Sequence, residues 1–244
     1  MLLRFWNVLR VCVVLFAAQS CAADVWDGTA FDAPPDALRK ASDTVRAAND
    51  DEATVLLNEK HFTFDSAGRV TEVRHVIYRI ETQEAVSGWS ETSVIWAPWN
   101  QSKPEIKARV ITTDGSVHWL DPKTLSDLPV NENTPDLYTD KRKFGGPLPA
   151  LAPGAIVEEE SVLRETAPFF AAGATTERNL AWSVVVNKTR VVLTYPESVP
   201  VKYKVNVLPA ISITKSVADH VETVVFEQVR LPAIPPKRIT SRRT

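Results

Sequence analysis

The chain has 244 residues, of which 44% are hydrophobic and 24% charged, and it contains only two cysteines. Its 28 basic and 30 acidic side chains give a formal net charge of −2. Because a nucleic-acid-binding surface needs an excess of lysine and arginine, this balance argues against a nucleic-acid partner.

The first 23 residues have the pattern of a cleaved secretory signal. Arg4 and Arg10 supply positive charge, residues 11–18 form a short apolar run, and Ser20-Cys21-Ala22 offers small residues for a cleavage site. The apolar run is too short to span a bilayer, which takes about 20 residues. We therefore expect an exported protein, periplasmic or extracellular, with no stable membrane span after cleavage.

Both cysteines, Cys12 and Cys21, lie in this signal. The exported chain would therefore have neither a cysteine nucleophile nor a thiolate metal site. Lipidation of Cys21 as a lipoprotein anchor is the alternative, but Ala18-Gln19-Ser20 matches the residues that precede such a cysteine poorly.

The remaining sequence predicts one helix followed by many strands. Residues 32–36 have the acidic cap and prolines of a helix start, and apolar residues then recur at helical spacing as far as Ala48. From Ala53 onward, apolar residues recur at every second position, as in a β-strand. We expect strands at residues 55–64, 70–82, 91–96, 155–166, 180–186, 189–195, 201–208 and 221–229. Apolar residues of both parities within 70–82 indicate a bulge or burial on both faces.

Two turns and one long loop complete the pattern. Residues 65–68 predict a hairpin turn, and Asp114-Gly115 predicts a type I′ hairpin within residues 107–121, which we place at the centre of a sheet. Residues 122–153 hold six prolines and Gly145-Gly146 without sustained periodicity. A loop of that length is usually functional or mobile.

Two antiparallel sheets packed face to face are the simplest architecture for these elements. We therefore predict an all-β fold, a two-layer antiparallel β-sandwich with one N-terminal helix. Its parts would be a signal peptide at 1–23, a helical appendage at 24–52, the sandwich at 53–236 and a frayed basic tail at 237–244.

Clustered aromatic residues are the candidates for a binding surface. Trp96 and Trp99 flank Ala97-Pro98 at a strand end, Trp119 follows the predicted hairpin turn, and Tyr138 lies in the long loop. Exposed rings at such places stack on sugars or on the surface of a partner. The same rings can instead fill a core, and both interpretations stay open.

Catalytic and metal-binding patterns are weaker. The four histidines, His61, His75, His118 and His220, have no metal-ligand spacing and fit partly exposed strand positions. Glu158-Glu159-Glu160 places Glu158 and Glu160 on one face of a strand, which paired carboxylates could use for glycoside hydrolysis. A solvated strand edge is the favoured interpretation. We predict no catalytic residue, no metal site and no cofactor.

Several short segments, in their order and spacing, resemble one family. They are Val76-Ile77-Tyr78-Arg79-Ile80, Ala108-Arg109-Val110 with Asp114-Gly115, Tyr138-Thr139-Asp140, Leu148-Pro149-Ala150-Leu151, Pro153-Gly154-Ala155-Ile156-Val157-Glu158 and Tyr195-Pro196-Glu197. Together they resemble DUF3857, a secreted bacterial β-sandwich domain that usually precedes a transglutaminase-like domain. The resemblance covers roughly residues 50–236. It transfers no catalytic residue, because the family's Cys-His-Asp triad belongs to the neighbouring domain.

The resulting hypothesis is a non-catalytic, exported accessory or interaction domain that is not an enzyme, with a cell-envelope protein or a glycan as its partner. One alternative is a carbohydrate-binding module that uses Trp96, Trp99 or Trp119. Others are a truncated remnant of a transglutaminase-like protein, or a hydrolase that uses Glu158, Glu160 or a histidine.

Overall fold

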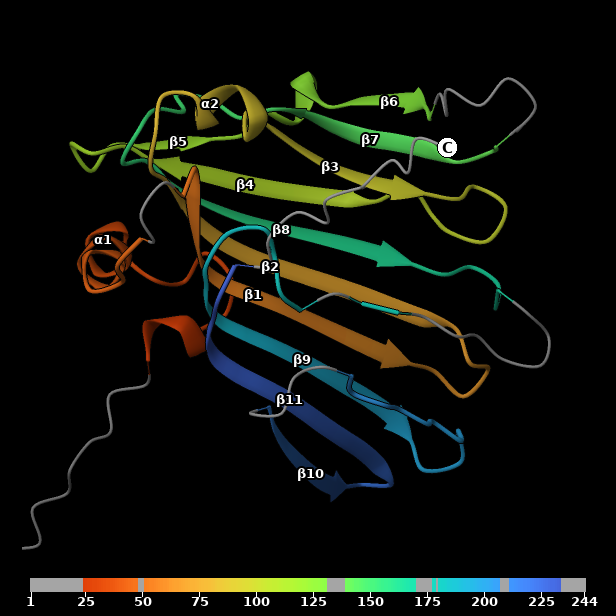
Figure 1. The fold of residues 1–244 in the computed structure, drawn as a ribbon. Helices are drawn as coiled ribbons and strands as arrows, with labels where there is room; N and C mark the ends of the chain where they lie inside the picture. Colours follow the sequence, from red (N-terminus) through yellow and green to blue (C-terminus); the bar gives the residue numbers. More distant parts are fainter. Residues whose placement is uncertain are drawn as a thin grey trace, which may run out of the picture.

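The computed structural model describes residues 24–47, 51–130, 139–169, 177–178, 180–206 and 211–233, whose strands form two unequal sheets (Figure 1). The large sheet has the strand order β10-β11-β9-β1-β2-β8-β4-β5 and the small sheet the order β3-β7-β6. The strands are β1 (Ala53–Phe64), β2 (Val70–Ile80), β3 (Glu91–Trp96), β4 (Glu105–Ile111), β5 (Val117–Trp119), β6 (Ser126–Pro129), β7 (Arg142–Pro147), β8 (Ile156–Arg164), β9 (Val186–Pro196), β10 (Ser212–Ala218) and β11 (Val221–Leu231). The predicted all-β sandwich is confirmed.

The helical segments are short: η1 (Val25–Asp27), α1 (Pro35–Asp43), α2 (Ala85–Gly88) and η2 (Pro122–Thr124). Helix α1 begins with proline in its first turn, as predicted, but ends before Ala48. Within the described residues, no helix is long and apolar enough to cross a membrane. The predicted signal at 1–23 and tail at 237–244 lie outside the described residues, and the domain limits stay predictions.

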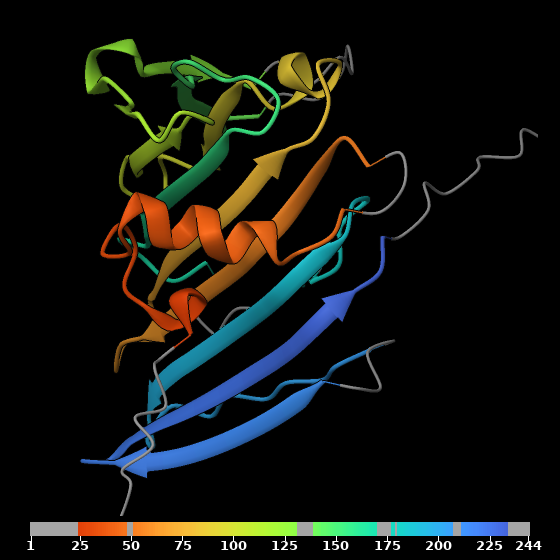
Figure 2. The ribbon, with the colours of Figure 1, turned by 90° about the vertical axis from the view of Figure 1, so that its left-hand side faces the viewer.

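Both faces of the large sheet are covered. Helix α1 lies across one face (Figure 2), where Leu38 is fully buried in a cluster with Leu57 and Ile77. On the opposite face, Val76 and Val157 pack with Leu148, which follows β7, in a cluster that also includes Ala85 of α2. Burying a side chain of this size fully contributes about 1.5–3 kcal/mol. Central strands covered on both sides explain why β2 does not alternate cleanly.

The pairing departs from a purely antiparallel sheet at one place. Strands β1 and β9 run parallel, with Leu57 opposite Lys188, while the other strand pairs of the sheet are antiparallel. The register irregularity expected within β2 occurs in its partner β1, between Val55 and Leu57. As a result Leu56 and Leu57 are both fully buried.

The hairpin of residues 107–121 is at the edge of the sheet, not at its centre. Strand β5 is the terminal strand and has only β4 as a neighbour. The turn is also not type I′, because Gly115 has φ 88° whereas Asp114 is not in the left-handed region. Asp114 instead accepts hydrogen bonds from Thr112 and Ser116. The predicted turn at 65–68 is present, with Gly68 at φ 79°.

Other boundaries were predicted wrongly. The segment 122–153 is not one loop, since it contains η2, β6 and β7. The described residues of 180–185 and 201–206 form no strand. Strand β10 was missed because its sequence, Ser-Ile-Thr-Lys-Ser-Val-Ala, is mostly polar and all seven residues are exposed.

The turn between β10 and β11 carries backbone strain. Ala218 pairs with Val221, so the loop has two residues, and both Asp219 (φ 50°) and His220 (φ 61°) are left-handed. This is the type I′ geometry that Asn-Gly prefers. A residue with a Cβ atom costs roughly 1–2 kcal/mol in that region.

We predict that Asp219→Asn combined with His220→Gly raises the free energy of unfolding by about 1 kcal/mol, because the left-handed strain is relieved. Urea unfolding of both proteins would measure the difference. Ala67→Gly is the control, because Ala67 is a turn residue outside the left-handed region. It should lower stability by about 0.5 kcal/mol. If the free energy of unfolding of the double variant were equal to or lower than that of the wild type, the turn would not be strained.

Candidate functional site

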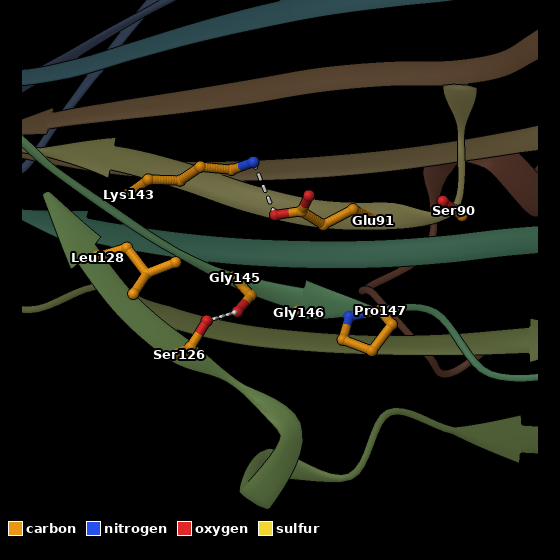
Figure 3. Close-up of a pocket in the computed structure, with 8 residues that line it drawn as sticks. All are labelled: Ser90, Glu91, Ser126, Leu128, Lys143, Gly145, Gly146 and Pro147. Carbon is orange, nitrogen blue, oxygen red and sulfur yellow. Dashed lines mark hydrogen bonds and ion pairs between the residues drawn. The ribbon is translucent and has the colours of Figure 1, made fainter. Parts of the chain in front are cut away.

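The outward face of the small sheet exposes apolar side chains. Ile95 of β3 and Leu128 of β6 both pair in register with Lys143 of the central strand β7. Each of the two apolar residues is 56% exposed. Leu128 and Lys143 both line a hollow of about 350 Å³. Figure 3 shows their side chains on the neighbouring strands β6 and β7. An exposed apolar pair of this kind suits contact with another macromolecule.

The floor of this hollow is backbone. At Gly145 an added Cβ atom would lie 2.3 Å from the carbonyl oxygen of Thr92, so only glycine allows β3 and β7 to approach this closely. Ser126 Oγ donates to the Gly145 carbonyl oxygen at 3.4 Å. Lys143 Nζ forms an ion pair with Glu91 Oε1 at 2.7 Å (Figure 3). The Gly145-Gly146 pair assigned from sequence to a loop therefore shapes a sheet face.

The main cluster of ionisable groups lies elsewhere, under the N-terminal segment. Glu158 of β8 is 1% exposed, and its carboxylate accepts hydrogen bonds from three directions. His75 of β2 approaches Oε1 at 3.0 Å, and Arg109 Nε of β4 donates to Oε2 at 2.7 Å. The backbone N–H of Phe31 donates to Oε1 at 2.7 Å.

The surroundings of Glu158 favour its charged form. Burial alone would raise the pKa of Glu158, but the hydrogen bonds from His75 and Phe31 and the charge of Arg109 hold it below its usual value. Its oxygens are occupied by donors from within the chain. The arrangement is therefore suited to fixing the N-terminal segment, since Arg109 also donates to the carbonyl oxygen of Ala33 at 2.7 Å.

The structure changes the interpretation of the glutamate run. Strand β8 lies between β2 and β4, so it is not a solvated edge, and Glu158 and Glu159 are buried. Glu158 and Glu160 share a face, as predicted, but Glu158 is enclosed in the ion-pair network. Sequence reasoning missed Arg109 and His75 as its partners, because strand pairing between distant segments cannot be read from the local pattern.

The histidines differ in burial and in the elements on which they lie. His75 is buried at 5% exposure, so the prediction of a partly exposed position is wrong for it. His61 contacts Glu59 Oε1 at 2.8 Å, and His220 lies in the β10–β11 turn, outside any strand. Among the residues that the structure describes, no three His, Cys, Asp or Glu side chains are placed to hold a metal ion.

The predicted aromatic residues do not form one surface. Trp96 is buried, at 9% exposure, whereas Trp99 is 55% and Trp119 48% exposed. Trp99 lies next to Phe169, with ring centroids 5.2 Å apart. Trp119 lies on β5 and contacts Phe31 on the α1 side, with centroids 5.4 Å apart. Tyr138 is outside the described residues, and the binding role of all four stays a prediction.

We predict that Glu158→Gln lowers the free energy of unfolding by about 3 kcal/mol, because the buried Arg109 guanidinium loses its counter-charge. Since the pKa of Glu158 is lowered on folding, its stabilisation is present above the ordinary value of 4.5 and is lost as pH falls through the folded value. The free energy of unfolding should therefore fall less steeply with falling pH in the variant than in the wild type. Urea titrations between about pH 3 and pH 7 would measure both effects.

Glu105→Gln is the matched control. Glu105 pairs with Arg164 at 2.5 Å, but its side chain is 67% exposed. An exposed pair contributes about 1 kcal/mol or less. If both variants lost the same free energy of unfolding, burial of the Glu158 ion pair would not add to its contribution to stability.

Comparison with known proteins gives a family match and a fold match. The family model described as a domain of unknown function with a solved structure, DUF3857, matches residues 66–235. No curated protein sequence matches the chain. The solved structure of "a putative protease" from Parabacteroides distasonis has a TM-score of 0.68 at 16% identity, and this chain covers 38% of it while 79% of this chain is matched.

M1 zinc metallopeptidases from Deinococcus radiodurans also match, at 12% identity over 74% of this chain and 40% of theirs. Their TM-score of 0.35 is too low to support any argument about this chain.

The expectation that the chain is not an enzyme is contradicted. It rested on the missing thiol and on the resemblance, yet the same fold occurs in a chain described as a protease. At 16% identity this similarity shows the fold alone, and the P. distasonis chain is much longer than the part matched here. Because the family model covers most of the described sandwich, the chain belongs to the DUF3857 family.

Proposed function

We propose that this chain is an exported accessory module that acts beside a protease-like domain. The observation that carries the proposal is the fold match to the P. distasonis structure, in which a sandwich of this kind accounts for 38% of a chain described as a protease. The family resemblance suggests that such a domain is transglutaminase-like. The module's part would be to hold that domain or its polypeptide substrate in place.

The outward face of the small sheet is the contact surface that this function favours. Helix α1 packs on one face of the large sheet, and α2 with the segments around Leu148 and Leu180 packs on the other, so both faces make contacts within the chain. Ile95 and Leu128 remain exposed beside the Glu91–Lys143 ion pair. Apolar contact flanked by charged residues is the usual composition of a protein interface.

Trp99 favours glycan binding as a second candidate function. Its half-exposed ring lines a hollow of about 500 Å³ together with Pro98, Pro129 and Arg142. An aromatic face next to a hydrogen-bonding guanidinium is a common arrangement for sugars.

We predict that the immobilised exported chain retains, from a cell-envelope extract of its source organism, a protein with a protease-like or transglutaminase-like domain. Mass spectrometry would identify the retained protein. Ile95→Glu combined with Leu128→Glu should reduce its recovery at least tenfold, because charged groups would have to be desolvated at the contact. Recovery of no such protein by the wild-type chain would refute the proposal.

A variant at the opposite side of the molecule serves as the control. Val229→Glu replaces a residue that is 59% exposed on β11, at a distance from the small sheet, and should leave recovery unchanged. If Val229→Glu reduced recovery of the retained protein to a similar extent, the protein would be binding to exposed apolar residues nonspecifically.

For the glycan candidate, we predict that Trp99→Ala abolishes binding on a glycan array, because the stacking surface is removed. Trp119→Ala should not affect it, since Trp119 contacts Phe31 on another part of the molecule. Wild-type protein that binds no glycan would exclude this second function.

A further inference from the structure

Strand β10 forms a long exposed edge of the large sheet. It is the terminal strand, and among the described residues β11 is its only strand partner (Figure 1). All seven of its residues are exposed. The strand at the other edge, β5, has only three residues. An exposed edge as long as β10 can pair with a strand of another polypeptide.

The backbone groups of β10 point alternately toward β11 and away from it. Ala218 and Val221 close a two-residue turn and therefore exchange their hydrogen bonds, so every second residue counted back from Ala218 is bonded to β11. The N–H and C=O groups of the residues between them, Ile213, Lys215 and Val217, point outward. Another extended backbone has donors and acceptors at the matching spacing, so an added strand can satisfy all of these groups.

The side chains of the outward-pointing residues add an apolar surface. Ile213 is 46% and Val217 53% exposed, and the alternation of the strand places both on one face. Phe226 pairs with Ile213 on that face, and the ring of Tyr203, which is 45% exposed, packs edge-on against Phe226 with centroids 4.9 Å apart. Residues of an added strand opposite Ile213 and Val217 would cover this surface.

The features that usually prevent pairing at a sheet edge do not protect β10. Proline, bulges and outward lysines are the common ones. The strand contains no proline, and its register with β11 is unbroken. Its one lysine, Lys215, pairs through Nζ with Glu222 of β11 at 2.7 Å, so the ammonium group is held toward β11 and not beyond the edge.

A second copy of this chain fits the edge poorly. Antiparallel pairing of two β10 strands that brings Ile213 opposite Val217 also brings the two Lys215 residues opposite each other. Like charges in that arrangement destabilise a sheet. A shift by two residues pairs Ile213 with Lys215 and loses the apolar contact. An acidic residue opposite Lys215, with apolar residues opposite Ile213 and Val217, fits the edge better.

We propose that β10 binds an extended segment of another polypeptide as an added antiparallel strand. The segment has apolar residues at positions i and i+4, which face Val217 and Ile213, and an acidic residue midway between them, which faces Lys215. Backbone hydrogen bonds provide the affinity of such a complex, and alternate side chains provide its specificity. This inference does not rest on the proposed protease-like partner, because it concerns another sheet and is tested with the purified chain alone.

Calorimetric titration of the purified chain with synthetic peptides tests the proposal. The peptide acetyl-Thr-Val-Thr-Glu-Thr-Val-Thr-amide has the proposed pattern, and the N–H groups of its valines would point to β10. N-methylation of both valines should weaken binding by about tenfold or more, because two hydrogen bonds are lost. N-methylation of the two threonines beside the glutamate should leave binding unchanged, since their N–H groups point away from β10. Equal effects of the two methylation patterns, or no binding of the unmethylated peptide, would overturn the proposal.

Lys215→Pro is the decisive variant of the chain. It removes an outward N–H and places a ring at the edge, while the hydrogen bonds to β11 are kept. It should abolish peptide binding, whereas Lys215→Thr, which also lacks the ion pair with Glu222, should bind as the wild type does. Circular dichroism would verify that both variants are folded, and the methylated peptides decide the matter if Lys215→Pro is not. Peptide binding retained in a folded Lys215→Pro would refute the proposal. A wild-type dimer that this substitution dissociates in sedimentation velocity would assign the edge to a second copy instead.

Discussion

The N-terminal part of the molecule depends on the buried carboxylate of Glu158. Placing an ion in this position costs several kcal/mol, which is recovered only if every oxygen finds donors of good geometry. Here β2 and β4 each supply one charged or polar donor, and the third comes from the Phe31 backbone outside the sheet. The carboxylate is therefore fully satisfied only while the N-terminal segment is in place. Phe31 itself holds φ 70°, so the contact also maintains a strained backbone.

The register of the sheet extends this polar arrangement over six of its strands. From β11 to β4, one row on the α1 side holds Glu227, Arg190, Glu59, His75, Glu160 and Lys107. Acidic and basic side chains alternate along it, and Asp27 of η1 adds ion pairs to Lys188 at 2.7 Å and Arg190 at 2.5 Å. A helix on such a face cannot rely on apolar contact alone. The segment 24–47 precedes the family match at 66–235, whereas Glu158 and Arg109, which anchor it, lie within that match.

Sequence reasoning identified what depends on local pattern. The period-two runs gave β1, β2, β3, β8 and β11, and the prolines of residues 34–35 marked the start of α1. Sequence reasoning failed where the environment of a residue depends on strands that are distant in the sequence. Glu158 looked solvated because the local pattern does not reveal Arg109 in the neighbouring strand. Strand β10 has no apolar alternation to detect, since it is held by backbone pairing with β11 and buries no side chain. The proline-rich segment hid β6 and β7 because proline and glycine usually indicate loops.

The same covering of the large sheet explains where charge collects and where binding can occur. A sheet buried on both faces ordinarily has apolar central strands. This one has charged side chains on both faces. Under α1 they find partners in the N-terminal segment, where Asp27 pairs with Lys188 and Arg190 and the Phe31 N–H donates to Glu158. On the opposite face Arg74 and Arg178 pair with Glu159 and Glu72, and Leu180 and Val201 pack against the strands. The small sheet differs in kind: its outward face is apolar and hollowed by Gly145, which suits a protein surface rather than an ion.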